Sequence, residues 1–348
     1  MIRRYLEGYD KFKCIADKCP DTCCSGWLIE IDDESLLKYK ELSAKDNEFG
    51  NRIDFNNQCF KQEDNRDCAF LCKDGFCYMQ REYGEKTLCY TCDMYPRHVE
   101  EFPQTREYSL SVSCPVVAKT LIQKKSYIKF SDSEDLEKDD EEYEEFNELL
   151  YSNLLELRTV IVKLLSENSA KYEIKAQRII NSMQAVQEAI DEGIWVSLVG
   201  EFEKCNKGVT ENSFEEYLSE FELIENLEPL RREFSAWMKQ SLNKLKSETD
   251  VEKHYSIFDK EHPEMDMIQC NVTLYFIYTY FCGAVYDDYV YSMARLSIFA
   301  GRMIKLLCFA KWLECGKIEV DEILYKLCRE LEHSADNISI IKQELDLM

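Results

Sequence analysis

The sequence is poor in the residues that build cofactor-binding turns. Its 348 residues include only 11 glycines, 6 prolines and 4 histidines, and no two glycines are spaced as Gly-x-Gly. A doubly wound α/β domain binds its cofactor on a glycine-rich turn that follows the first strand. Strand and helix patterns also fail to alternate along the chain. We therefore exclude an enzyme of the Rossmann type.

Long hydrophobic runs are absent as well. No window of about eighteen consecutive residues is apolar throughout, which argues against a membrane span. The first residues, Met1–Tyr5, lead into polar sequence without the apolar stretch of a secretion signal. Hydrophobic residues still make up 45% of the chain, enough to build a substantial core. We expect a soluble, cytoplasmic protein with no membrane partner.

Positive charge is in deficit. The chain has 43 Lys and Arg against 67 Asp and Glu, a net charge of −24. This argues against a nucleic-acid partner, because phosphate binding needs concentrated basic residues. The acidic residues are densest in residues 131–145, where ten of them accompany one lysine. Such a run is typical of a solvated segment, and we expect an acidic linker over residues 126–142.

Cysteine is the residue in excess. Eleven of the 17 cysteines fall within the first 114 residues. Because the thiols of cytoplasmic proteins are kept reduced, a disulfide framework is disfavoured and metal ligation is favoured. Ten cysteines in short polar turns are therefore candidate metal ligands: Cys14, Cys19, Cys23, Cys24, Cys68, Cys72, Cys77, Cys89, Cys92 and Cys114. Cys59 fits no spacing, and the six cysteines after residue 200 suit buried packing.

The spacing of these cysteines limits the kind of site. Cys89-x2-Cys92 holds two thiolates close enough to share one metal ion. Neighbouring residues such as Cys23 and Cys24 normally point apart, so they serve two sites, or one ligates while the other packs. Ligation by thiolates alone suits zinc or an iron–sulfur cluster. Zinc knuckles usually pair two CxxC turns, and only one is present here. We therefore favour iron–sulfur, with zinc as the alternative.

The hydrophobic pattern predicts a mainly α protein. Residues 1–125 form the predicted metal-binding module, with a short strand over residues 27–31, a helix capped by Asp33, a hairpin over residues 97–113 and a helix from Pro115 to Ile122. Residues 143–348 are expected to be an all-helical domain. Helices are predicted within residues 146–164, 174–199, 213–225, 228–246, 266–286, 288–315 and 319–332. Residues 272–282 are apolar on all sides and are expected to form a buried central helix.

Three segments resemble the flagellin lysine-N-methylase family, within a wider group of CxxxxCxxxCC metal-chelating proteins. They are CIADKCPDTCCSGWLIEID, DCAFLCKDGFCYMQREYGEKTLCYTCDMYPR and EYSLSVSCPVVAKTLI, which lie within residues 10–122. The ten candidate cysteines match the cysteines of the family's motifs. The resemblance implies transfer of a methyl group from S-adenosylmethionine to lysine side chains of flagellin, with a protein-bound iron–sulfur cluster, 4Fe-4S in type.

Residues around the cysteines are candidates for supporting roles. We expect Tyr95 and Arg97, which follow the CxxC turn, to bind the cofactor; Arg97 is equally well explained as half of a structural ion pair. Trp27 is expected to be a lid over the cluster. His98 offers a mixed Cys/His site, which is less favoured than thiolates alone. Four tyrosines could line a channel for a lysine side chain, although core packing explains at least two of them: Tyr83, Tyr90, Tyr95 and Tyr108.

Two points leave the enzyme interpretation open. The CxxxCxxC motif of radical enzymes is absent, and no residue stands out as the base that a lysine substrate requires. One alternative is a protein-interaction adaptor in which zinc only staples the module; another is a redox or metal-storage protein. The oligomeric state and the catalytic residues are not indicated by the sequence.

Overall fold

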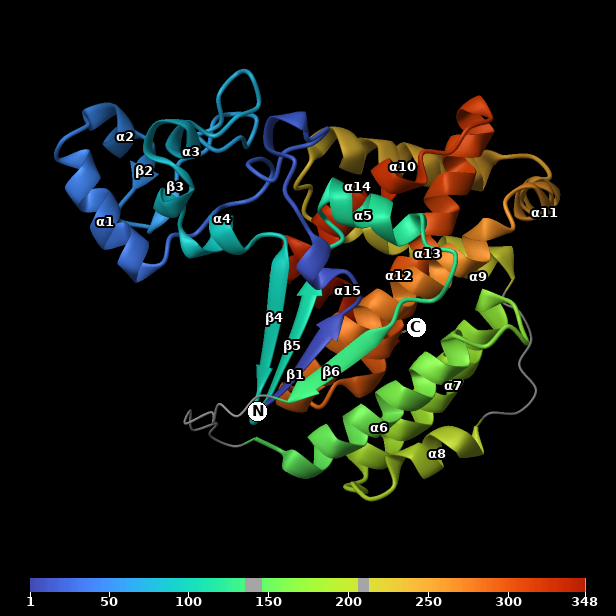
Figure 1. The fold of residues 1–348 in the computed structure, drawn as a ribbon. Helices are drawn as coiled ribbons and strands as arrows, with labels where there is room; N and C mark the ends of the chain where they lie inside the picture. The colour runs from blue at the N-terminus through green and yellow to red at the C-terminus, as the bar shows by residue number, and fades with distance from the viewer. Residues whose placement is uncertain (135–145, 206–212, 348) are drawn as a thin grey trace.

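The computed structural model describes residues 1–134, 146–205 and 213–347. It is a mainly helical protein with a few short strands, which confirms the predicted fold class. A four-stranded sheet lies between a small N-terminal lobe and a larger body of helices (Figure 1). No helix among these residues combines the length and apolarity needed to cross a bilayer.

The sheet joins the two ends of the cysteine-rich region. Its strand order is β4-β5-β1-β6, with bounds of Ile2–Leu6 for β1, Arg97–Phe102 for β4, Thr105–Leu110 for β5 and Phe130–Glu134 for β6. Strand β1 pairs with β5 in parallel, from Ile2 opposite Thr105 to Tyr5 opposite Tyr108. Parallel pairing requires a long crossover connection. Here the crossover carries the whole small lobe.

A buried carboxylate fastens the sheet to the helices. Glu107 of β5, 3% exposed, accepts hydrogen bonds from Arg4 of β1 at 2.6 Å and from Arg158 of α6 at 2.5 Å. The apolar faces of the sheet and of the helices then share one large core, which runs from Leu6 to Leu345.

The helical body surrounds two helices that are buried on almost every side, α12 (Glu264–Tyr280) and α13 (Val290–Cys315). Their apolar sequences leave no polar face for solvent. The other helices of the body present one apolar stripe each. They are α5 (Pro115–Ile122), α6 (Glu148–Leu165), α7 (Tyr172–Asp191), α8 (Leu198–Lys204), α9 (Phe214–Glu222), α10 (Arg232–Ser247), α11 (Val251–Glu261), α14 (Val320–Glu332) and α15 (Ala335–Leu347), with short 3₁₀ turns at Leu223–Asn226 and Phe281–Tyr286.

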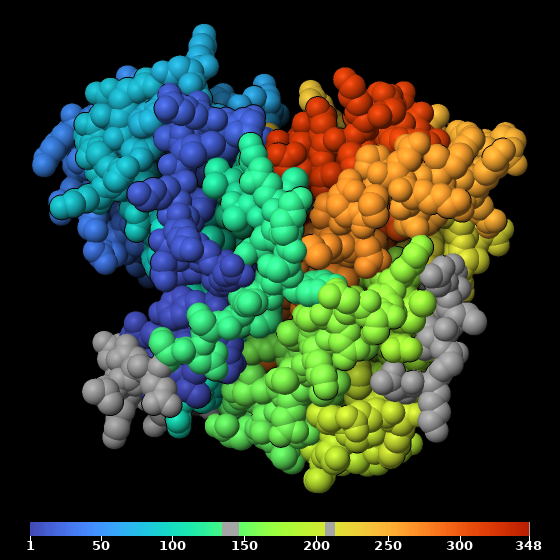
Figure 2. Space-filling model, turned by 45° about the vertical axis from the view of Figure 1, so that its right-hand side comes forward, coloured from blue at the N-terminus to red at the C-terminus, as the bar shows by residue number. Residues whose placement is uncertain are grey.

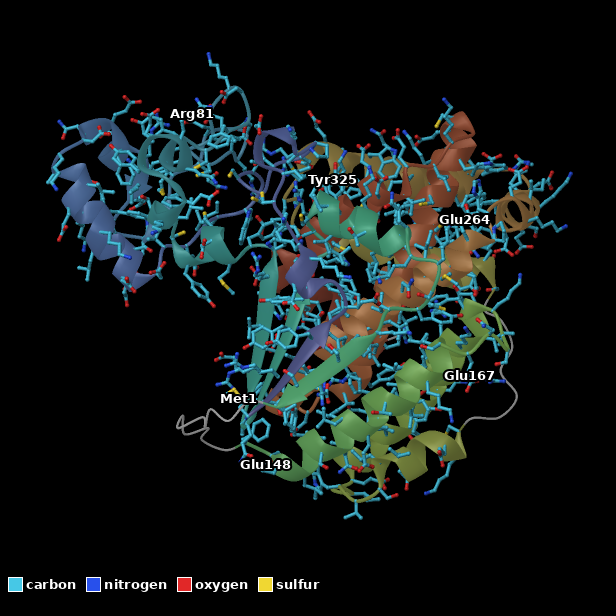
Figure 3. The ribbon with its side chains drawn as sticks, in the orientation of Figure 1. Met1, Arg81, Glu148, Glu167, Glu264 and Tyr325 are labelled. Atoms are coloured by element: carbon cyan, nitrogen blue, oxygen red, sulfur yellow. The ribbon has the colours of Figure 1, made fainter. Side chains whose placement is uncertain are left out.

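The small lobe, residues 23–94, has its own core and is called the cysteine lobe below. Aromatic rings of Tyr39, Phe49, Phe60 and Phe70 form the centre of this core, with Cys68 and Cys89 packed against them. Its elements are α1 (Asp33–Ser43), α2 (Asn47–Asn51), β2 (Ile53–Asp54), β3 (Cys59–Phe60), α3 (Tyr78–Tyr83) and α4 (Tyr90–Met94), with a 3₁₀ turn at Glu85–Thr87. In Figure 3, Arg81 marks this lobe and Tyr325 marks the nearby helical body.

Most of the predicted elements are present. The hairpin, the helix from Pro115 to Ile122 and the buried helix over residues 272–282 are confirmed. Helix α1 begins at Asp33, but its cap is Asp32, whose side chain accepts from the backbone N–H of Ser35 at 2.9 Å. The predicted strand over residues 27–31 is wrong, because only Glu30 there makes a β-bridge. The helix predicted over residues 174–199 ends at Asp191. The elements that were not predicted are strands β1, β2, β3 and β6 and helices α2, α3, α4, α11 and α15.

The acidic run begins inside the sheet. Residues 130–134 form edge strand β6, and Asp132 pairs with Arg4 of β1 at 2.8 Å, so the basic residues of β1 offset the charge of β6. The rest of the expected linker, residues 135–142, lies outside the described residues. The division into domains at residues 125 and 143 stays a prediction. Packing groups the chain differently, with Cys114 and α5 in the large core.

Helices α12 and α13 approach so closely that only glycine fits at one point. A Cβ atom added at Gly301 of α13 would overlap the hydroxyl groups of Thr273 and Tyr172. These two hydroxyls are hydrogen-bonded to each other at 2.8 Å. We expect Gly301→Ala to lower the free energy of unfolding by about 1–3 kcal/mol, although alanine favours a helix by about 1 kcal/mol.

Urea unfolding of the full chain measures this effect. Gly283→Ala is the matched control, because nothing lies within 4 Å of a Cβ at Gly283, and its expected change stays within about 0.5 kcal/mol. A stability gain for Gly301→Ala would contradict the close approach of the two helices.

Candidate functional site at the junction of the two cores

A cavity of about 330 Å³ opens where the cysteine lobe meets the sheet and the helical body. Its walls come from the segment between β1 and α1, from α3 and α4, from the start of α5, and from α14 through Arg329. Figure 2 shows the blue and cyan N-terminal lobe beside the orange and red C-terminal helices. The site is therefore assembled by parts of the chain that are far apart in sequence.

Seven of the ten candidate cysteines line this cavity: Cys14, Cys19, Cys23, Cys24, Cys77, Cys92 and Cys114. The other three belong to the cysteine lobe just behind the wall. Cys68 and Cys89 are buried in its core, and Cys72 is partly exposed beside the turn that ends at Cys77. None of the ten is in a disulfide bond. The fold thus gathers a set of free thiols that spans a hundred residues of sequence.

The thiols fall into two groups: the pKa values of one group are affected by Cys14, and those of the other group are affected by Cys24. Burial is the largest effect that raises the pKa of Cys19 and Cys114, and a hydrogen bond with Cys24 is the largest for Cys23. The Cys14 thiol adds a smaller increase to the pKa of all three. The Cys24 thiol likewise raises the pKa values of Cys68, Cys77 and Cys92. For Cys77 the pKa is raised to about 11, mainly by burial. The first group lies toward the body and the second within the lobe.

In two pairs of thiols, each member shifts the pKa of the other. The Cys23 thiol hydrogen-bonds to that of Cys24, which lowers the Cys24 pKa to about 7 and raises the Cys23 pKa. In the same way Cys92 bonds to Cys89 and lowers the Cys89 pKa. Cys23 and Cys24 thus act on each other, and the expectation that they serve two different sites stays a prediction. They link the two groups of thiols.

The described residues contain no cluster of three or more His, Cys, Asp or Glu side chains arranged to hold a metal ion. The thiols share one neighbourhood, but they do not converge on a common point. Their chemistry, thiolates without histidine, fits zinc or an iron–sulfur cluster. The assignment of the ten cysteines as metal ligands stays a prediction.

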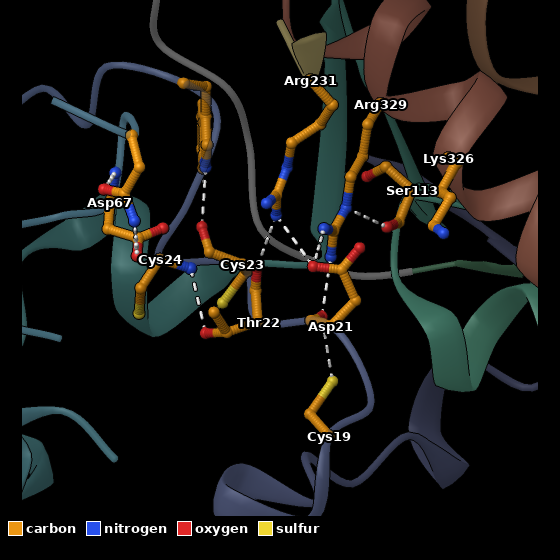
Figure 4. Close-up of polar contacts among 12 residues, drawn as sticks. Cys19, Asp21, Thr22, Cys23, Cys24, Asp67, Ser113, Arg231, Lys326 and Arg329 are labelled. Atoms are coloured by element: carbon orange, nitrogen blue, oxygen red, sulfur yellow. Dashed lines mark hydrogen bonds and ion pairs between the residues drawn. The ribbon is translucent and has the colours of Figure 1, made fainter. Parts of the chain in front are cut away.

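Asp21 joins the segment Cys14–Cys24, called the cysteine segment below, to the helical body (Figure 4). Its carboxylate accepts from Arg231, the residue just before α10, at 2.8 Å and forms an ion pair with Arg329 of α14, also at 2.8 Å. The guanidinium of Arg329, 1% exposed, also donates to the carbonyl oxygens of Asp21 and Ser113. Two arginines from the body therefore fix the chain between Cys19 and Cys23.

The serines before Cys114 are held by the end of α14. Glu332 accepts hydrogen bonds from the Ser111 hydroxyl and the Ser113 N–H, both at 3.1 Å. The Ser113 hydroxyl is 2.9 Å from His333 Nε2 and 3.0 Å from the Tyr95 hydroxyl. Burial raises the pKa of Glu332 and lowers that of His333 to about 3, so His333 is neutral near pH 7.

Some of the predicted neighbours reach the cavity. Tyr95, Arg97 and Trp27 line it, and Arg97 also stacks over the ring of Phe12 at 5.5 Å. Trp27 donates to the Cys23 carbonyl at 2.7 Å and packs on His333 with ring centroids 4.5 Å apart. Trp27 is thus part of the wall. Cofactor binding by Tyr95 and Arg97 stays a prediction.

Other candidates face elsewhere. His98 bonds to Glu100 at 2.8 Å, Tyr83 bonds to Asp46, and Tyr108 stacks on Tyr5 in the sheet. Tyr90 is 63% exposed. Cys59 lies buried in β3, away from the cavity. Of the four tyrosines proposed for a lysine channel, Tyr95 alone lines the cavity.

Sequence reasoning missed the residues that complete the site. Ser111 and Ser113 begin the run Ser111–Pro115, called the SxSCP segment below, which lies within the family-like stretch EYSLSVSCPVVAKTLI, so that stretch was a signal for them. Nothing in the sequence connects Asp21 with Arg231 or Arg329, because more than 200 residues separate them. His333 could have been noticed only as one of four histidines.

The fold and the cavity define a mainly helical protein with a cysteine cluster at the junction of two cores. In sequence, the chain is 29% identical over 122 residues to the flagellar biosynthetic protein FliU of Salmonella muenchen, which covers 32% of this chain and 71% of that protein. It is 28% identical to the lysine-N-methylases of Salmonella typhimurium and Salmonella choleraesuis, over 32% of this chain and 30% of each of those proteins. These matches confirm the resemblance to the flagellin lysine-N-methylase family.

The likeness has clear limits. It covers about a third of this chain and less than a third of each lysine-N-methylase. No family model matches the chain, and no solved structure resembles it.

We expect Asp21→Asn to loosen the cysteine segment, because it leaves the buried Arg329 without its counter-charge. The expected loss in the free energy of unfolding is on the order of 2–4 kcal/mol. This is slightly less than the loss when a fully buried ion pair is broken, because the Asp21 side chain is 17% exposed. The labelling rate of Cys23 by a thiol reagent, followed by peptide mass spectrometry, should rise in parallel.

Asp74→Asn is the matched control, because its pair with Arg81 is exposed and such pairs contribute less than about 1 kcal/mol. Equal effects of the two substitutions on stability and on labelling would show that Asp21 does not anchor the segment.

Proposed function

We propose that this protein is an S-adenosylmethionine-dependent lysine N-methyltransferase that acts on flagellin and carries a cysteine-bound iron–sulfur centre. The observation that carries the proposal is the cavity at the junction of the two cores, which collects seven free thiols together with Tyr95 and Arg97. The resemblance to proteins named lysine-N-methylase and to a flagellar biosynthetic protein supports the reaction and the substrate.

The two thiol groups would hold the metal centre. One consists of Cys14, Cys19, Cys23 and Cys114, and the other of Cys24, Cys68, Cys77, Cys89 and Cys92, with Cys72 beside it. The low pKa of Cys24 favours the thiolate form that binds metals. When bound, an iron–sulfur cluster with an open coordination position would supply a point of attachment for the methionine part of the cofactor.

The remaining walls suit the two other participants. Arg97 offers a guanidinium for a carboxylate such as that of the methionine part. The rings of Trp27 and Tyr95 have centroids 6.0 Å apart. Such aromatic rings suit the aliphatic and cationic portions of a lysine side chain. No glycine-rich turn is needed, because the cofactor would be bound at the cavity and not at a strand end.

The helical body has a structural role in this proposal. It supplies Arg231, Arg329 and Glu332, which hold the two cysteine-bearing segments at Asp21 and at Ser111–Ser113. Flagellin would approach from the open side of the cavity. The net charge of −24 suits a substrate surface that presents lysine.

The decisive experiment is anaerobic purification followed by iron, sulfide and zinc analysis, with an assay of labelled methyl transfer to flagellin. Iron and sulfide in near-equal amounts, a visible spectrum that responds to S-adenosylmethionine, and label on flagellin lysines are the expected results. Stoichiometric zinc without a chromophore and without transfer would favour the alternative, a zinc-stapled adaptor.

Single cysteine substitutions refine the assignment. We expect Cys92→Ser and Cys19→Ser, one from each thiol group, to lower the bound metal and to abolish methyl transfer. Cys59→Ser is the matched control, because Cys59 is a buried thiol outside the cavity, and its metal content should equal that of the wild type. Metal loss in all three variants would point to general unfolding, which circular dichroism would reveal.

A further inference from the structure

A chain of hydroxyl groups leads from the cavity wall to a carboxylate on the far side of the SxSCP segment. The Tyr95 hydroxyl is 3.0 Å from the Ser113 hydroxyl, which in turn contacts the Ser111 hydroxyl at short range. Ser111 donates to Glu332 Oε2 at 3.1 Å. Each hydroxyl can donate to the next, so the three hydrogen bonds can all point toward Glu332.

Glu332 is surrounded by groups that hold its carboxylate in place. The second oxygen, Oε1, accepts from the Tyr280 hydroxyl at 2.7 Å and from the Tyr275 hydroxyl. The titratable groups that face it are Tyr275 and Tyr280 from α12, His98 from β4 and Cys328 from α14. Arginine and lysine do not bond to this carboxylate among the described residues. Burial raises its pKa, so it binds a proton more readily than an ordinary glutamate.

We propose that Tyr95, Ser113 and Ser111 relay a proton from the substrate amine in the cavity to Glu332, which is the general base of the reaction. This inference rests on the proposed function, because a lysine ammonium cannot accept a methyl group until it loses a proton. Ser111 and Glu332 do not touch the substrate and act through Tyr95. Ser111 passes the proton on, and Glu332 accepts it.

The proton and electron balance of the relay is simple. The ammonium gives a proton to Tyr95 Oη while each hydroxyl passes its own proton onward, and Glu332 becomes a neutral carboxylic acid. The freed amine then forms the N–C bond as the C–S bond of S-adenosylmethionine breaks, and that electron pair stays on sulfur. Glu332 returns the proton to solvent after the product leaves, and the relay is restored.

The test compares the pH dependence of methyl transfer to flagellin for the wild type, Ser111→Ala and Glu332→Gln. At neutral pH both variants should be slower by about 10²–10⁴-fold, the usual contribution of a general base. The deficit should shrink as the pH approaches about 10, where the lysine amine becomes neutral without help. A merely structural role would give a deficit that is the same at every pH.

Ser109→Ala is the matched control. Ser109 lies two residues before Ser111, is 1% exposed, and its hydroxyl lies outside the relay. This variant should keep the wild-type rate within about twofold and the wild-type pH profile, since it removes the same atom from the same segment. A wild-type rate and pH profile for Ser111→Ala, or a deficit independent of pH, would overturn the relay.

A spectroscopic measurement separates this inference from the proposed function. Infrared spectra of the wild type minus those of Glu332→Gln should show a carboxylic acid carbonyl band that disappears as the pH is raised, at a higher pH than for an ordinary glutamate because the carboxyl group is buried. The same band should titrate at a different pH in Ser111→Ala, which lacks one hydrogen bond to the carboxylate. A wild type that transfers no methyl group would end the proposed function, whereas absence of the titrating band would end the relay whatever the activity.

Discussion

The ion pairs between Asp21 and two arginines of the helical body are the contacts on which the rest of the site depends. Asp21 lies between Cys19 and Cys23. Arg231, just before α10, and Arg329, on α14, lie more than 200 residues later in the chain. The segment from Cys14 to Cys24 has no strand and only one short 3₁₀ turn of its own. The position of this segment is therefore set by the helical body, and the cavity forms where the segment and the body meet.

The parallel pairing of β1 with β5 explains why such a junction can form. The chain leaves the sheet after Leu6, builds the cysteine lobe and returns through β4 and β5. Cys14 and Cys114 lie shortly after the two strands of that pair, so the sheet holds the two ends of the cysteine region together. The lobe has its own aromatic core, which lets it carry the remaining thiols as a unit. The helical body is then a scaffold for the site as well as the larger part of the fold.

The polar groups at this junction are linked and not independent. Arg329, Glu332 and His333 follow each other on or just after α14 and contact Asp21, Ser111 and Ser113. Such a network costs free energy when only partly satisfied, yet it places a carboxylate within three hydrogen bonds of Tyr95. A protein that needed the body for stability alone could have filled this region with apolar side chains.

The sequence by itself determined the fold class, the helices of the body, the hairpin and the concentration of thiols, because these follow from local periodicity, proline placement and residue counts. The short strands β1 and β6 escaped prediction, since five residues carry too little pattern and their pairing is with distant strands. The tertiary structure alone decided which cysteines share the cavity and that Asp21, Glu332 and His333 belong to the site. Contacts across 200 residues leave no periodic trace in a single chain, because they are fixed by how the two cores pack and not by the sequence near either partner.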